Sequence, residues 1–97
     1  MKALLKDQVI AEAAKDELIY IEGNWYFPPA SAMLDLLEKS PTAYTCPWKG
    51  ACQYWNVDDI KDAAWSYDSP IQSGIDRVGK DFTGYLAFDK SHIELSE

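Results

Sequence analysis

Both cysteines of the chain and two of its four tryptophans lie in one stretch, Cys46-Pro47-Trp48-Lys49-Gly50-Ala51-Cys52-Gln53-Tyr54-Trp55. Residues 42–46 and 51–55 are of types that favour strands. Between them, a proline early and a glycine late fit a four-residue loop built on a type I turn. The stretch therefore predicts a β-hairpin.

The expected loop length decides how the two thiols lie. With four loop residues Cys46 pairs opposite Ala51, which places Cys52 on the other face of the hairpin. Only a five-residue loop or a bulge would set the thiols side by side for a disulfide. Because cysteines in a reducing compartment are mostly free, we expect two free thiols.

A metal site is not expected either. The Cys-x5-Cys spacing is wider than that of a zinc knuckle, and His92 is the single histidine. These residues supply at most three soft ligands, whereas structural zinc takes four. The run Asp58, Asp59 and Asp62 lacks the spacing of a calcium loop and is read as a solvated turn.

Before the hairpin, residues 9–13 and 18–22 are short strand-forming runs, and their spacing predicts that they pair with each other. Gly23-Asn24 is a two-residue turn that leads into a third strand, residues 25–27. Pro28-Pro29 ends the sheet, because proline has no N–H to donate to a ladder. Residues 31–39 then predict a short helix with Ser31 as its N-cap.

After the hairpin, residues 63–67 predict another strand that stops at Asp68-Ser69-Pro70. Apolar residues at 71, 75 and 78 predict a helical turn or two, weakened by Gly74. Strands are expected over residues 82–88 and 93–95. Six to eight short strands with one or two small helices indicate an α+β domain, mainly antiparallel β, built as a small barrel or a two-sheet fold.

Length and charge limit the function. Ninety-seven residues without an internal repeat form one domain, residues 1–97. The net charge is −7 and Arg77 is the only arginine, so we expect neither a nucleic-acid nor a membrane partner. The apolar run near the N-terminus, Ala3 to Leu5, is too short for a signal peptide, so the protein is expected in the cytoplasm.

Four motifs occur in order along the chain: Gly23-Asn24-Trp25-Tyr26-Phe27-Pro28, Cys46-Pro47-Trp48-Lys49-Gly50 with Tyr54-Trp55, Ala64-Trp65-Ser66-Tyr67-Asp68-Ser69-Pro70, and Gly84-Tyr85-Leu86-Ala87-Phe88. With these motifs the chain resembles the bacterial family called domain of unknown function 427. The resemblance implies a small β-rich domain, related in shape to zinc-carrying β-tent proteins, with no established activity. A nucleotidyltransferase label is sometimes attached to the family, but the chain has no Gly-Ser motif followed by an Asp-x-Asp pair.

The leading hypothesis for function is a module that binds a small molecule or a protein segment without a cofactor. Lys49 and Gly50 at the hairpin tip offer an ammonium and backbone N–H groups that could hold an anion. Alternatively, Lys49 is a solvated loop residue and Gly50 only supplies a positive φ. Aromatic side chains from several strands could line a cleft beside Lys49. The expected ligand-binding residues are Tyr26, Trp48, Lys49, Gly50, Tyr54, Trp65 and Tyr67.

Two other functions remain open at this point. In the first, the protein is a small enzyme with Cys46 as nucleophile, Lys49 lowering the pKa of its thiol, and Tyr26 or His92 carrying the proton. In the second, it is a structural interaction domain that uses helix 31–39 or an open sheet edge, with a homodimer as one outcome. The first needs a reactive thiol and the second needs an oligomer or a partner.

Overall fold

Nine strands, one α-helix and three 3-10 turns make up the structure, a computed structural model that describes residues 1–97. The strands are β1 (Lys2–Leu5), β2 (Gln8–Glu12), β3 (Ile19–Ile21), β4 (Asn24–Tyr26), β5 (Leu37–Cys46), β6 (Gly50–Val57), β7 (Ile60–Ser66), β8 (Leu86–Phe88) and β9 (Glu94–Ser96). The helix is α1 (Gln72–Val78), and the 3-10 turns are η1 (Lys15–Glu17), η2 (Pro29–Ser31) and η3 (Leu34–Leu36).

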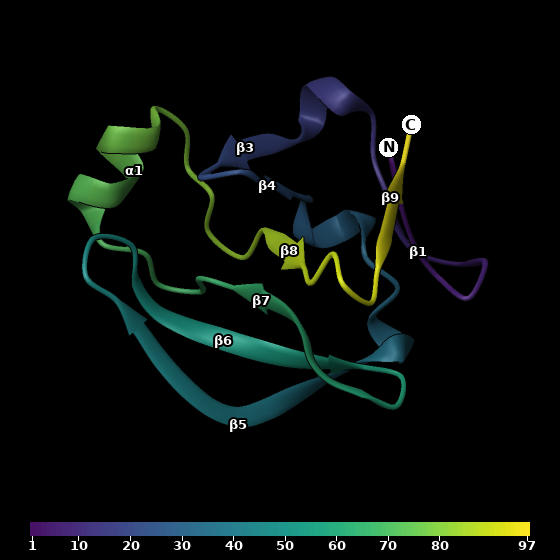
Figure 1. The fold of residues 1–97 in the computed structure, drawn as a ribbon. Coiled ribbons are helices and arrows are strands. Elements are labelled where there is room, and N and C mark those ends of the chain that lie inside the picture. The colour runs from purple at the N-terminus through teal and green to yellow at the C-terminus, as the bar shows by residue number, and fades with distance from the viewer.

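The strands form three antiparallel sheets, with orders β2-β1-β9, β3-β4 and β5-β6-β7-β8. Figure 1 shows β5, β6 and β7 as a curved layer, with β3 and β4 above it, α1 at one end and β9 with both chain termini at the other. This arrangement confirms the α+β, mainly antiparallel fold class. The sheets stay open, so the barrel that the sequence left as one alternative is not formed.

The N-terminal pairing differs from the prediction. Residues 9–13 do not pair with residues 18–22; β2 pairs with β1 instead, with Leu5 opposite Gln8. Lys6 and Asp7 connect the two strands with φ of 50° and 67°. Two consecutive residues of positive φ match the right-handed twist of a hairpin, which explains why so short a connection works. Neither residue is glycine, so the usual signal for such a turn is missing.

The next hairpin is present, one residue earlier than expected. β3 pairs with β4 with Ile21 opposite Asn24, so the loop is Glu22-Gly23 rather than Gly23-Asn24. Both loop residues have positive φ, 51° and 86°. Glycine adopts this conformation without steric cost, whereas Glu22 adopts it against preference.

The helix predicted over residues 31–39 is wrong. The 3-10 turns η2 and η3 occupy its first part, and Leu37 to Lys39 begin β5 by pairing with residues 55–57 of β6. An apolar triplet at helical spacing is a weak local signal, because isolated short helices gain little by themselves. Long-range strand pairing therefore decides the conformation of this segment.

The central hairpin is confirmed, but its loop has three residues, Pro47 to Lys49. Cys46 lies opposite Gly50, and Tyr44 lies opposite Cys52. Since Gly50 and Cys52 are two residues apart on one strand, both cysteines point to the same face. The prediction that they lie on opposite faces is wrong, because it assumed one loop residue too many.

The C-terminal half follows the prediction more closely. The strand expected over residues 63–67 extends from Ile60 to Ser66, and α1 spans nearly the segment expected to be helical. Gly79 ends α1 with φ of 85° and donates its N–H to the carbonyl of Ile75 at 2.8 Å, which is an αL cap. The strand expected over residues 82–88 is reduced to its last three residues.

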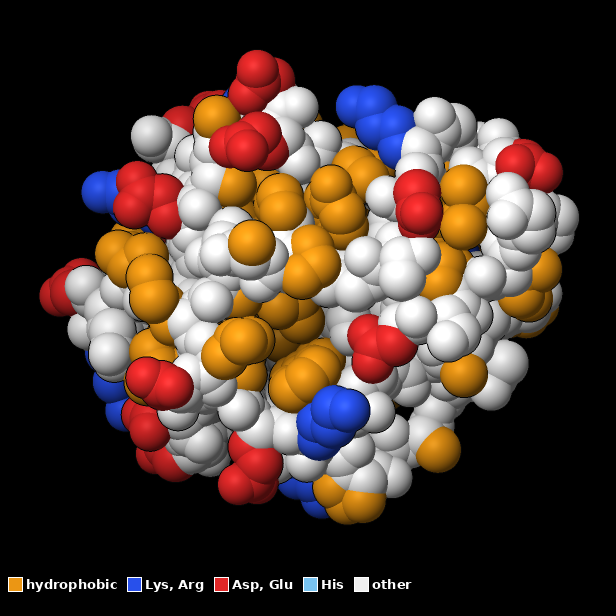
Figure 2. Space-filling view, turned by 180° about the vertical axis from the view of Figure 1, so that it is seen from behind, with side chains coloured by type: hydrophobic (Ala, Val, Ile, Leu, Met, Phe, Trp, Pro, Cys, Tyr) orange, Lys and Arg blue, Asp and Glu red, His pale blue; other side chains and the backbone are white.

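Two hydrophobic clusters form the core. The first lies between β1, β2 and one face of the large sheet, and the second lies between β3, β4 and the hairpin of β5 and β6. In Figure 2, apolar side chains gather in a band across the face opposite to that of Figure 1, and acidic side chains lie scattered around it. No helix of the protein is both long enough and apolar enough to cross a membrane.

Candidate functional site

The residues predicted to form a site gather around the second cluster, which consists of Ile19, Ile21, Tyr26, Cys46, Cys52, Tyr67, Phe82 and Ala87. Four of the seven predicted ligand-binding residues are buried there: Tyr26, Lys49, Gly50 and Tyr67. The other three, Trp48, Tyr54 and Trp65, pack against the cluster and are only partly buried. The structure thus divides the predicted set into a buried layer and an accessible layer.

Lys49 is neither a solvated loop residue nor a free anion clamp. Only 5% of it is exposed, and its ammonium donates a hydrogen bond to the Glu22 carboxylate in the turn between β3 and β4. The ammonium also lies 4.7 Å from the centroid of the Trp48 ring and 5.3 Å from that of Tyr67. Aromatic faces and a carboxylate together compensate a buried cation. An incoming anion would have to displace Glu22.

This ion pair joins two parts of the fold that are far apart in sequence. The hydrogen bond from Lys49 holds the pKa of Glu22 below its ordinary value, because the ionised carboxylate is the better acceptor. Glu22 itself stays largely open to solvent, with 56% of its side chain exposed. The pair therefore fastens the turn between β3 and β4 to the tip of the β5–β6 hairpin.

Trp48 is held from both the hairpin and the helix. The guanidinium of Arg77, on α1, lies 4.5 Å from the centroid of the Trp48 ring, so this ring contacts two cations. The N–H of Ile71 donates to the carbonyl of Lys49 at 2.9 Å. At Gly74 an added Cβ would lie 2.5 Å from the carbonyl oxygen of Trp48. Glycine at this position thus permits a close approach of α1 to the hairpin tip.

Tyr54 and Trp65 lie side by side on one face of the large sheet. They are register partners on β6 and β7, and their ring centroids are 6.5 Å apart. The Trp65 indole N–H donates to the Tyr26 hydroxyl at 3.0 Å. Burial raises the pKa of Tyr26 to about 12, so this hydroxyl is protonated at neutral pH. This hydrogen bond therefore fixes the Trp65 ring on its buried side, while part of the ring stays accessible.

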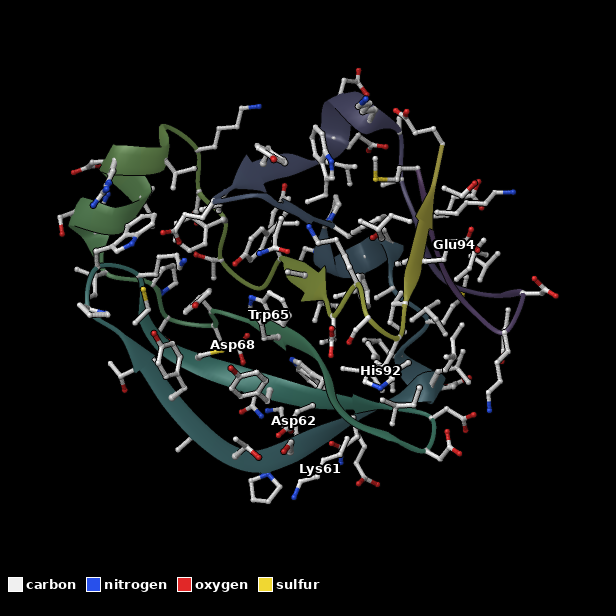
Figure 3. All side chains as sticks on the ribbon, viewed as in Figure 1. Lys61, Asp62, Trp65, Asp68, His92 and Glu94 are labelled. Carbon is white, nitrogen blue, oxygen red and sulfur yellow. The ribbon has the colours of Figure 1, made fainter.

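Cys46 and Cys52 are unbridged and buried, 6% and 8% exposed. Burial raises the pKa of Cys52 to about 11, which keeps its thiol protonated at neutral pH. The structure does not bring His92 to Cys46. His92 lies on the β9 side of the molecule, where its Nδ1 is 3.1 Å from an Asp89 oxygen, whereas the hairpin tip lies beside α1 (Figures 1 and 3). A role for Cys46 as nucleophile stays a prediction.

Several residues of this region were missed in the sequence. Glu22 and Arg77 contact the predicted residues only because β3, β4 and α1 fold onto the hairpin, and no local pattern marks them. The sequence predicts Asp62 in a solvated turn, but one of its oxygens accepts a hydrogen bond from the Thr42 hydroxyl at 2.7 Å. Figure 3 shows Asp62 against the large sheet. Its φ of 55° could not be anticipated for a non-glycine residue inside a strand.

The two concave regions of the surface lie elsewhere. One is lined by residues 90–95, and the other by residues of η1 and the start of β3 together with Lys80, Asp81 and Tyr85. Neither contains one of the seven predicted ligand-binding residues, although His92, the candidate proton carrier, lines the first. The accessible aromatic side chains therefore form an open surface rather than a deep pocket.

A family model described as "Domain of unknown function (DUF427)" matches residues 1–97. The chain belongs to this family. The match confirms the resemblance drawn from the four motifs, each of which contributes a residue to the cluster described above. No curated protein matches the chain. Membership of the domain of unknown function 427 family carries no activity with it, so the function has to be proposed from the site.

Proposed function

We propose that this protein is a cytoplasmic module that binds a small molecule or a short peptide segment against Trp48, Tyr54 and Trp65. The observation that carries the proposal is that these three rings keep open surface while the groups behind them are buried and fixed. Fixed aromatic side chains give contact area without a large loss of side-chain entropy on binding. A ligand with a planar or apolar face suits such a surface.

The buried members of the predicted set support the surface. Tyr26 accepts a hydrogen bond from Trp65, and the Lys49 ammonium lies over the Trp48 ring. Since Glu22 neutralises Lys49, that lysine borders the surface and orients Trp48 rather than offering a free charge. Gly50 contributes a positive φ of 111° at the start of β6, which lets the tight loop close.

The four tryptophan indole N–H groups provide a direct test. In a ¹⁵N-labelled sample, a fragment library of planar heteroaromatic compounds is added and the indole signals are followed by NMR. We expect binding fragments to shift the signals of Trp48 and Trp65. Trp25 pairs with Tyr20, and Trp55 packs against the other cluster, so their signals serve as internal controls.

The Tyr54→Ala variant should weaken such a fragment about tenfold, because stacking on one aromatic ring contributes on the order of 1 kcal/mol. Tyr20→Ala is the matched control, since Tyr20 is an exposed tyrosine on a different sheet. Fragments that move only Trp25 or Trp55, or that bind Tyr54→Ala as tightly as wild type, would place the site elsewhere.

A further inference from the structure

β5 is the longest strand of the protein and has one open edge. It is the terminal strand in the order β5-β6-β7-β8 and has ten residues. Its last four residues, 43–46, pair with β6 on one side. In an antiparallel ladder alternate residues direct their N–H and C=O groups to opposite sides, so half of these groups point away from β6. An open edge of this kind is a template for another strand.

The other edge strands of the three sheets are either covered or very short. The outer side of β2 is covered, because Ala11 forms a bridge with Ala32 and the Met33 N–H donates to the carbonyl of Ile10 at 2.7 Å. On β8, Leu86 and Phe27 exchange two hydrogen bonds of 2.8 Å. The strands β3, β4 and β9 have only three residues each. β5 alone is both long and uncovered.

The second half of β5 carries none of the charges that usually protect an edge, because its charged residues Glu38 and Lys39 lie in the first half. Residues 40–48 include no charged side chain, in a chain where charged residues make up 26%. Ala43, Tyr44 and Thr45 are exposed, and half of the Tyr44 side chain is open to solvent. Proline is the one protective residue present, at positions 41 and 47. The two prolines stand at equal distances from Tyr44.

We propose that residues 42–46 of β5 pair antiparallel with the same residues of a second copy of this chain, about a two-fold axis at Tyr44. This register sets Tyr44 opposite its own counterpart and Pro41 opposite Pro47 of the second copy. The prolines, which cannot donate, then meet at both ends of a five-residue ladder. The two four-stranded sheets become one continuous sheet.

The pairing fits a second copy better than an unrelated strand. An isologous interface must be self-complementary, and a neutral segment with symmetrically placed prolines satisfies that condition. A charged edge would repel its own copy in a protein of net charge −7. Five paired residues form a smaller interface than the roughly 1,200 Å² of a stable complex, so the dimer is weak and depends on concentration.

The register makes a distinctive test possible. Because Tyr44 faces itself, both Tyr44→Glu and Tyr44→Lys place like charges directly opposite each other, and each should weaken the dimer at least about tenfold. A mixture of the two variants places opposite charges there and should recover the dimer. Tyr20→Glu is the control, since Tyr20 is 58% exposed and lies on another sheet.

Sedimentation velocity over protein concentrations from about 10 μM to 1 mM measures the result, and a weak dimer dissociates within this range. We expect the wild-type mass to rise from the 11.0 kDa of one chain toward twice that value. Circular dichroism confirms that the variants are folded. A wild type that stays at 11.0 kDa, a Tyr44→Glu variant that dimerises normally, or a mixture that stays monomeric would each overturn the proposal.

Discussion

Replacing Gly74 by alanine changes the stability of the protein in two opposite ways, one through helix propensity and one through packing. Alanine is favoured over glycine inside a helix by about 1 kcal/mol, so propensity alone predicts that Gly74→Ala stabilises α1. In the structure the new Cβ would lie 2.5 Å from the carbonyl oxygen of Trp48 and 3.5 Å from the Lys49 Cα. The nearest atom belongs to the backbone and cannot rotate away, so α1 or the hairpin tip must shift.

The expected magnitude follows from these two effects. Overpacking of this kind costs typically about 1–3 kcal/mol, and a backbone contact belongs at the upper end. After subtraction of the propensity gain, Gly74→Ala should lower the free energy of unfolding by about 2 kcal/mol. For a domain of this size, that loss lowers Tm by roughly 8–16 °C. Urea unfolding followed by circular dichroism measures it.

Two control variants, one on α1 and one at the residue that ends it, test whether the contact with Trp48 causes the loss. Ser73→Ala changes an exposed neighbour and should stay within about 0.5 kcal/mol of wild type. Gly79→Ala introduces no contact within 4 Å but places alanine at φ of 85°, so it should lose about 1 kcal/mol through backbone strain alone. If Gly74→Ala instead stabilises the protein, α1 does not approach Trp48 as described, and the support of the hairpin tip by the helix is refuted.

Three further predictions concern the same region. Cys46 and Cys52 should resist alkylation by iodoacetamide at pH 8 in the folded protein and react only on unfolding, since both are buried. Fast labelling of Cys46 in the native state would contradict this prediction and support Cys46 as a nucleophile. The Glu22 pKa is lowered on folding, so its contribution is present above the ordinary value of 4.5 and is lost as pH falls through the lower folded-state value. Glu22→Gln should therefore reduce the free energy of unfolding by at most about 1 kcal/mol at neutral pH, with the difference vanishing in acid, as measured by urea unfolding at several pH values. Phe82→Ala should cost about 3–5 kcal/mol, because the ring is fully buried; a loss below 1 kcal/mol would contradict its place in the core.

The sequence predicted the elements whose signals are local. The hairpin around residues 47–50 and the helix near residues 71–78 are bounded by proline and glycine, and both are present. The sequence could not show that the predicted helix 31–39 is absent. Its last three residues begin β5 only because they pair with residues 55–57, far along the chain. The pairing of β1 with β2 was missed for another reason, since Lys6 and Asp7 form a tight turn without glycine.

For the candidate site, the sequence by itself determined which residue types are present: an aromatic surplus, two cysteines and a lysine at a hairpin tip. The tertiary structure decided what each of them does. The loop is one residue shorter than predicted, so both thiols lie on one face of the hairpin. The packing of β3 and β4 against the hairpin places the Glu22 carboxylate beside the Lys49 ammonium. Burial depends on which elements pack together, so only the folded chain separates the buried Tyr26 and Tyr67 from the accessible Tyr54 and Trp65.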